Sequence, residues 1–196
     1  MRRALAALVA VLAALALAPA LPLQDAGAYR LATYFWPDSR IPVPFCVNPT
    51  GIPAGDDGLP IMTGQEFIEE VIAAFDKWRS VGLSRIWAVY VGPCPDSLAG
   101  NNDDGVNTVG WGALAGPQVG LTRVRSFVAT REAIEADLIL DNFSVRRIFA
   151  GEMDQYRRKV LPAILAHEAG HFLGLDHSPD PRALMYDTLP DGELIQ

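Results

Sequence analysis

The chain has 196 residues, half of them hydrophobic, and its 23 Asp and Glu residues outnumber 16 Lys and Arg residues. This length and this hydrophobic share suit one globular domain with a sizeable core. The formal net charge of −7 argues against nucleic acid or an anionic lipid surface as the partner.

The first twenty residues have the composition of a secretory signal peptide. Arg2 and Arg3 precede an apolar run over residues 4–18, and small residues around Ala20 suit a signal peptidase. A membrane anchor is the alternative, but the run is shorter than the roughly 20 residues that a spanning helix needs. We therefore predict a signal peptide over 1–20, an N-terminal segment over 21–37 and a domain over 38–196. We expect this domain to be extracellular or periplasmic, with no membrane span after signal cleavage.

The first predicted strand contains two prolines. Hydrophobic residues alternate with other residues over 41–47, which is the period of a strand. Pro42 and Pro44 both lack a backbone N–H on the same side of it. We therefore expect incomplete pairing on that side at the start of the strand.

A capping box over Thr63 to Glu66 predicts the start of a helix. Hydrophobic residues follow at helical spacing and should face the core. These residues are Phe67, Ile68, Val71, Ile72, Phe75 and Trp78. Gly82 is the expected stop.

The remaining patterns predict several strands and a second helix. The strands cover 86–91, 108–111, 121–128 and 136–140, and the helix covers 157–173. Pro162 lies within this last pattern, and since proline is tolerated in a first turn, the regular helix should begin near Leu161. The order of strand, helix, several strands and helix predicts an α+β fold with a mixed sheet.

All three histidines of the chain lie in the segment 167–177. On a helix, His167 and His171 share one face, so both imidazoles can meet one metal ion. Glu168 is rotated by about 100° and can reach a water molecule on that metal. Gly174 can adopt a left-handed conformation that ends the helix, and His177 then supplies a third nitrogen. Three protein ligands leave zinc a fourth position for water, which is typical of catalytic zinc sites.

This motif resembles that of the metzincin peptidases, in which H-E-x-x-H-x-x-G-x-x-H precedes a methionine turn. Here Met185 follows His177 by eight residues, within Ala183-Leu184-Met185-Tyr186. Together with Ser178 directly after the third histidine, this is similar to the matrixin branch, the matrix-metalloprotease-like peptidases. The resemblance implies a metzincin catalytic domain with a twisted mixed five-stranded sheet, an active-site helix and a backing helix.

The resemblance also implies the chemistry of a secreted zinc-dependent endopeptidase that acts on proteins or peptides. It implies zinc ligands at His167, His171 and His177, a general base at Glu168 and a supporting methionine at Met185. The residues in the place of the family's substrate-pairing edge strand are Leu121, Thr122, Arg123 and Val124, within 121–128, and 137–141 takes the place of the strand beside it. We expect a monomer with one catalytic Zn²⁺.

Two further features concern stability and calcium. In an exported chain, the two cysteines, Cys46 and Cys94, suggest a disulfide that closes a loop of 48 residues. Such a bridge contributes at most about 4 kcal/mol by chain-entropy arithmetic, and two free thiols are the alternative. The segment Asn101-Asn102-Asp103-Asp104-Gly105 is rich in oxygen ligands for Ca²⁺, although such segments are more often solvated turns.

The chain departs from the matrixin pattern in four respects. No cysteine-bearing segment precedes the first strand, so we do not expect latency by a cysteine on the zinc. No fourth histidine is present for the structural zinc of animal matrixins. Few residues follow Tyr186, and they include Pro190 and Gly192, so we expect either that the family's last helix is missing or that the sequence is truncated. The family places its first strand inside the sheet, whereas Pro42 and Pro44 argue against full pairing at its start.

Two non-enzymatic classes compete with the peptidase hypothesis. A secreted recognition module could bind zinc without hydrolysing peptides, although zinc binding alone does not require Glu168. A structural surface protein could bind metal only weakly through its histidines, with a fold that a chelator leaves unchanged.

Overall fold

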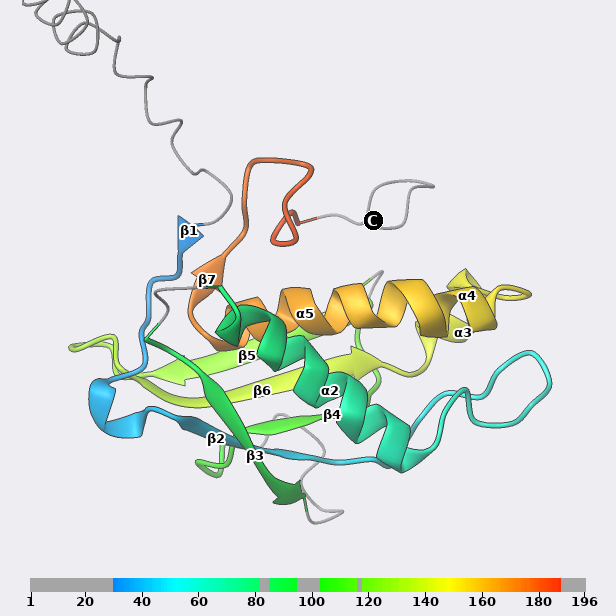
Figure 1. The fold of residues 1–196 in the computed structure, drawn as a ribbon, viewed down its shortest axis with the longest axis horizontal. Helices are drawn as coiled ribbons and strands as arrows, with labels where there is room; N and C mark the ends of the chain where they lie inside the picture. Colours follow the sequence, from blue (N-terminus) through cyan, green and yellow to red (C-terminus); the bar gives the residue numbers. More distant parts are fainter. Residues whose placement is uncertain (1–29, 82–84, 95–102, 116–117, 188–196) are drawn as a thin grey trace, which may run out of the picture.

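The computed structural model describes residues 30–81, 85–94, 103–115 and 118–187. Figure 1 shows how these residues are arranged. The predicted signal peptide, the helix stop at Gly82, Asn101 and Asn102 of the calcium prediction, and the tail with Pro190 and Gly192 lie outside the described residues.

A five-stranded sheet forms the base of the domain, with the strand order β3-β2-β4-β6-β5. The strands are β2 (Val43–Val47), β3 (Ala88–Pro93), β4 (Thr108–Gly112), β5 (Gly120–Ser126) and β6 (Ala133–Asp141). β5 lies at the edge and runs antiparallel to β6, whereas the other neighbouring strands are parallel. The mixed five-stranded sheet and the α+β class predicted from the sequence are therefore confirmed.

The prolines at the start of β2 limit its pairing as predicted. Val43 and Pro44 have partners in β3, but pairing with β4 begins only at Cys46, which lies opposite Thr108. The side-chain amide of Asn107 donates to the carbonyl oxygen of Pro44 at 2.8 Å. The strand thus lies inside the sheet, and a side chain replaces the backbone pairing on the β4 side.

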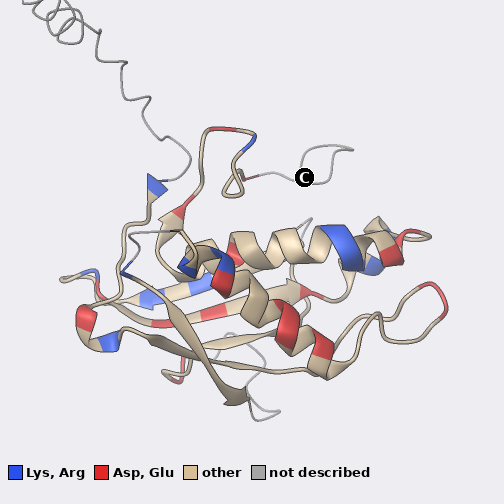
Figure 2. Ribbon diagram, viewed as in Figure 1, with Lys and Arg blue, Asp and Glu red and all other residues tan. Residues whose placement is uncertain are grey.

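Helix α2 (Gly64–Arg79) begins at the predicted capping box. The Glu66 backbone N–H donates to Thr63 Oγ1 at 3.2 Å, and the Thr63 N–H donates to Glu66 Oε2 at 2.7 Å. Acidic residues lie towards its first turn and Lys77 and Arg79 in its last turn, which suits the helix dipole (Figure 2).

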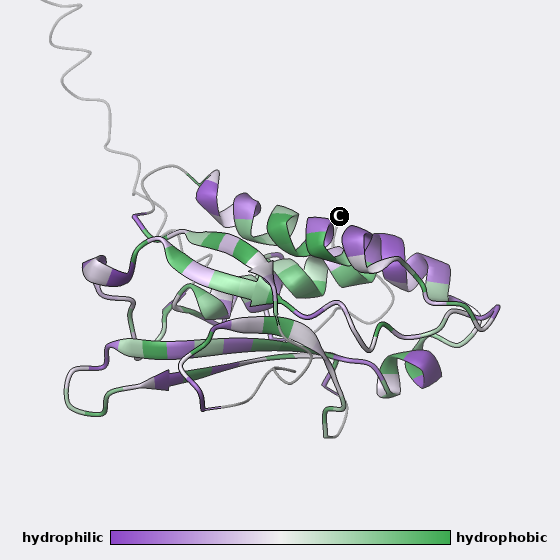
Figure 3. Ribbon diagram, turned by 90° about the horizontal axis from the view of Figure 1, so that it is seen from below, coloured by the Kyte–Doolittle hydropathy of each residue, from purple (hydrophilic) through white to green (hydrophobic). Residues whose placement is uncertain are grey.

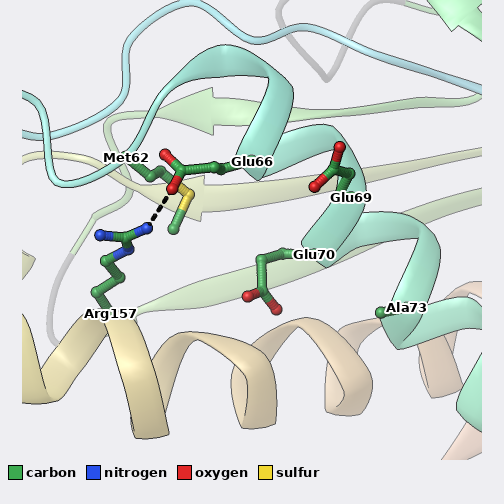
Figure 4. A pocket seen from close by; sticks show the side chains of 6 residues that line it. All are labelled: Met62, Glu66, Glu69, Glu70, Ala73 and Arg157. Atoms are coloured by element: carbon green, nitrogen blue, oxygen red, sulfur yellow. Dashed lines mark hydrogen bonds and ion pairs between the residues drawn. The ribbon is translucent and has the colours of Figure 1, made fainter.

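Helix α5 (Leu161–Phe172) continues a helical segment that starts further back. The preceding pieces are α3 (Ser144–Ile148), α4 (Met153–Gln155) and η2 (Tyr156–Val160), a single π-helical turn. The regular helix starts at Leu161, as Pro162 predicted. Arg157 in η2 forms an ion pair with Glu66 at 2.6 Å and so connects this segment to α2 (Figure 4).

Both long helices cover the same face of the sheet. Phe45 of β2 stacks on Phe75 of α2 with ring centroids 4.4 Å apart, and it also meets Phe172 of α5. A strand side chain points to one face only, so α2 and α5 must share that face. Hydrophobic and hydrophilic residues alternate along the helices (Figure 3), and Phe67 and Val71 are fully buried, as their spacing predicted.

Cys46 and Cys94 form the predicted disulfide, which ties β2 to the residue that follows β3. Among the described residues, no helix is both long and apolar enough to cross a bilayer.

Candidate metal centre

The three histidines reach one place from two segments. His167 and His171 lie one turn apart on α5, both half-buried. The helix ends at Phe172, and Gly174 adopts a positive φ of 100°, which turns the chain away as its predicted role required. The short strand β7 (Leu175–Asp176) follows and leads directly to His177.

The imidazoles point their Nε2 atoms at one another. His171 Nε2 lies 3.1 Å from His167 Nε2 and 3.1 Å from His177 Nε2. The three ligand atoms all lie within 4.8 Å of one another. Within the described residues, this is the one group of three or more potential metal ligands of the His, Cys, Asp and Glu types.

Backbone carbonyls determine which ring nitrogen can bind a metal. His167 Nδ1 lies 2.7 Å from the carbonyl oxygen of Leu184, and His171 Nδ1 lies 2.9 Å from that of Leu175. A carbonyl oxygen only accepts hydrogen bonds, so each Nδ1 carries the proton and each Nε2 keeps its lone pair. Two lone pairs that face each other at 3.1 Å repel, and a cation between them removes that repulsion. The donor set therefore fits a zinc ion.

The protonation of these rings suits metal binding as well. Burial lowers the pKa of His167 to about 4, and the hydrogen bond to Leu184 only partly opposes this. Burial likewise lowers the pKa of His171. Both imidazoles are therefore neutral at neutral pH, which is the form that ligates metals.

Glu168 is buried beside this cluster, with 7% of its surface exposed. Burial raises the pKa of its carboxyl group to about 7, and hydrogen bonds from Thr122 oppose this rise. The Thr122 hydroxyl lies 2.8 Å from Glu168 Oε2. A carboxyl group with a pKa near neutrality suits proton transfer in either direction.

The four residues predicted to pair with substrate all lie in β5. β5 is an edge strand and packs beside α5, and among the described residues no strand pairs with the other side of its backbone. Substrate pairing there remains a prediction. The contact from Thr122 to Glu168 was not foreseen; its only signal in the sequence is the strand period that places Gly120, Thr122 and Val124 on one face.

The methionine turn packs against α5. Met185 is fully buried, and its carbonyl oxygen accepts a hydrogen bond from the Ser178 N–H at 2.7 Å. A Cβ atom at Gly170 would lie 2.3 Å from Met185 Sδ. Gly170, one residue before His171, therefore allows the methionine to approach the helix, and the motif spacing alone does not single this glycine out.

The N-terminal segment contacts the same region. β1 (Arg30–Leu31) pairs antiparallel with β7, and the Ala32 N–H donates to the carbonyl oxygen of Gly174 at 2.9 Å. The Tyr34 hydroxyl donates to the carbonyl oxygen of His171, and Trp36 Nε1 donates to that of Phe172 at 2.7 Å. The bonds to His171 and Phe172 give carbonyl groups in the last turn of α5 a partner outside the helix.

The described part of the segment proposed for calcium, residues 103–105, forms no cluster of candidate metal ligands. Asp104 Oδ1 accepts a hydrogen bond from the Val106 N–H at 2.8 Å, which is a local turn. Asp103 lies 3.7 Å from Arg125 and is largely exposed. Calcium binding stays a prediction.

A separate pocket of about 390 Å³ lies between α2 and η2 (Figure 4). Its lining residues are Met62, Glu66, Glu69, Glu70, Ala73 and Arg157. None of the predicted site residues is among them, so this pocket is distinct from the histidine cluster.

Comparison with known proteins points to the same region of the chain. Residues 126–194 match the family model of the matrixins, a branch of the M10 peptidases. The match begins at the last residue of β5 and includes all three histidines, Glu168 and Met185. A search of curated proteins found no match. The histidine cluster lies within this match, so residues 126–194 are similar to the matrixins, a family of zinc metallopeptidases.

Proposed function

We propose that the chain is a secreted, zinc-dependent endopeptidase in which His167, His171 and His177 hold one zinc ion and Glu168 is the general base. The observation that carries this proposal is the convergence of three Nε2 atoms beside a buried carboxylate. Backbone carbonyls fix the tautomer of His167 and His171, so the cluster is organised for a metal before one binds.

Zinc in this place supplies Lewis acidity, because it lowers the pKa of water and polarises a carbonyl group. Glu168 takes a proton from the attacking water and later delivers it to the nitrogen of the leaving amine. Its raised pKa, about 7, suits both steps. The free side of β5 offers backbone N–H and C=O groups that can hold an extended peptide in register.

Two features support export. Residues 1–20 have the composition of a signal peptide. The Cys46–Cys94 disulfide suits an oxidising compartment, since disulfides are rare in the cytosol.

The test is digestion of a peptide library by the zinc-loaded chain, with and without a zinc chelator. We expect cleavage that the chelator abolishes. Glu168→Ala should keep the metal but lower turnover by roughly 10²–10⁴-fold, the usual contribution of a general base. His167→Ala should lose both zinc and turnover, because it removes a ligand.

The same assay separates the peptidase from a zinc-binding module that does not hydrolyse peptides. Such a module would bind zinc and leave the whole library intact. If Glu168→Ala cleaved as fast as the wild-type chain, the assignment of the base would be wrong.

A further inference from the structure

The edge strand contacts the proposed general base through one side chain. Thr122 Oγ1 lies 2.8 Å from Glu168 Oε2 and 2.9 Å from the backbone carbonyl oxygen of Glu168. The two residues are 46 positions apart in the chain, so this contact depends on the packing of β5 against α5. The Thr122 hydroxyl therefore meets two acceptor groups of the same residue.

This arrangement holds Glu168 through both its side chain and its backbone. A hydroxyl has one hydrogen to donate and two lone pairs that accept, so at any moment the Thr122 hydroxyl donates to one of the two Glu168 oxygen atoms. Because both oxygen atoms lie within hydrogen-bond distance, the hydroxyl limits where the Glu168 carboxyl group can lie relative to the helix backbone.

Gly120 provides the space in which this carboxyl group lies. A Cβ atom at Gly120 would lie 2.9 Å from both Cγ and Oε1 of Glu168, and 2.7 Å from Ile164 Cγ2. Such distances are shorter than real Cβ contacts, so any larger residue must move Glu168 or the strand. Gly120 and Thr122 are two residues apart and point to the same face of β5.

We infer that Thr122 is a positioning residue for Glu168, holding its carboxyl group in place through a hydrogen bond, and that Gly120 leaves the room this requires. This inference rests on the proposed function, in which Glu168 is the general base. In the proposed function, β5 then both positions Glu168 through Thr122 and offers its backbone to the peptide substrate.

A purely structural role is the alternative, in which Thr122 only ties β5 to α5. It would lower stability when removed but leave turnover per folded molecule unchanged. Thr122→Val tests this directly, because valine keeps the shape and the strand preference of threonine and loses only the hydroxyl. Thr122→Ser restores the hydroxyl, and Thr130→Val is the control, since the Thr130 hydroxyl bonds to nearby Glu132 in an exposed loop.

We expect Thr122→Val to lower kcat by about 10-fold to 100-fold, since a misplaced catalytic group has a cost of this order. KM should stay within about twofold, because substrate binding does not use the hydroxyl. Thr122→Ser should recover kcat to within about threefold of wild type, and Thr130→Val should match wild type. Zinc affinity should be the same in all four proteins, since none of the changes removes a ligand.

A second readout does not depend on activity. Crystal structures of the metal-free wild-type and Thr122→Val proteins should show the Glu168 carboxyl group in different positions, with Thr122→Ser like wild type. Gly120→Ala should also displace it and lower kcat, and it serves as an independent test if Thr122→Val fails to fold. A kcat for Thr122→Val within twofold of wild type, or an unmoved carboxyl group, would overturn the inference. A wild-type chain that binds zinc but cleaves no peptide would instead overturn the proposed function, while the crystal structures would still test the placement of Glu168.

Discussion

At the scale of single residues, the backbone prepares the histidines for a metal. The Nδ1 atoms of His167 and His171 bond to the carbonyl oxygens of Leu184 and Leu175, not to side chains. The sequence motif predicts which residues meet, but it carries no sign of these partners, because any residue at either position would supply a carbonyl group. Chain geometry after the helix determines the tautomer.

Gly170 shows a second constraint that the motif spacing leaves open. Its hydrogen atom faces Met185, where a methyl group would lie 2.3 Å from Sδ, and Trp78 also lies close, at 3.0 Å. The motif leaves this position unspecified, so the sequence alone does not predict a need for glycine there. The requirement follows from the methionine turn packing against the helix.

We therefore predict that Gly170→Ala lowers the free energy of unfolding by about 1–3 kcal/mol, as overpacking of a core does. Met185→Ala should lower it by about 2–5 kcal/mol through the cavity it leaves. In the double variant the costs should be less than additive, because the new methyl group enters the space that Met185 vacates. Urea unfolding of the metal-free proteins measures all three values.

The control pairs Gly170→Ala with Met153→Ala, which removes a buried side chain in α4 at the far end of the helical segment. Those two costs should add, because the sites share no contact. If the losses in free energy of unfolding for Gly170→Ala and Met185→Ala were also additive, this would contradict the close packing of the methionine turn on α5.

At the scale of elements, the sequence predicts those helices and strands that are long enough to show a hydrophobic period. Strands β2, β4, β5 and β6 and helix α2 all show their pattern, and Pro162 marks the start of α5. α3 has five residues and α4 has three, so neither is long enough to display a helical period. The π-helical turn η2 has no sequence signature either, and it joins α4 to α5 in one helical segment.

Helix α2 contacts α5 beside the segment that carries the histidines. Trp78 Nε1 donates to the carbonyl oxygen of Ala166 at 2.7 Å, one residue before His167. The start of α2 depends on the capping box of Thr63 and Glu66. Loss of the cap should therefore destabilise the fold without touching the site.

We predict that Thr63→Ala lowers the free energy of unfolding by about 1 kcal/mol, the typical value of a helix cap. Thr63→Ser should stay close to wild type, because serine can accept the same hydrogen bond. Chemical denaturation measures the difference, and zinc affinity at temperatures where both variants are folded should be unchanged. Equal stability of the alanine and serine variants would show that the capping box contributes nothing measurable.

At the scale of the whole molecule, the site is assembled from segments far apart in the chain. Thr122 contacts Glu168, Met185 contacts Gly170, and Tyr34 and Trp36 bond to the end of α5. The motif over 167–177 predicts the three candidate ligands and the carboxylate, because these residues lie close together in the sequence. The contacts around them depend on tertiary packing, which residue spacing alone does not encode.

The N-terminal segment illustrates the difference. Residues 30–36 carry no motif, and the domain was expected to start at residue 38. In the structure, β1 pairs with β7 beside His177, and Trp36 is almost fully buried. This part of the segment packs on the domain, and its side chains donate hydrogen bonds to backbone carbonyl groups at the end of α5.

In the proposed function, one zinc ion on the three histidines makes this chain a peptidase. The most direct test is to titrate zinc into the metal-free protein while peptide hydrolysis is followed. We predict that the rate rises in proportion to bound zinc and reaches its plateau at one zinc ion per chain, because the histidines form a single three-ligand site. Full occupancy at one zinc ion per chain with no peptide hydrolysis would contradict the account.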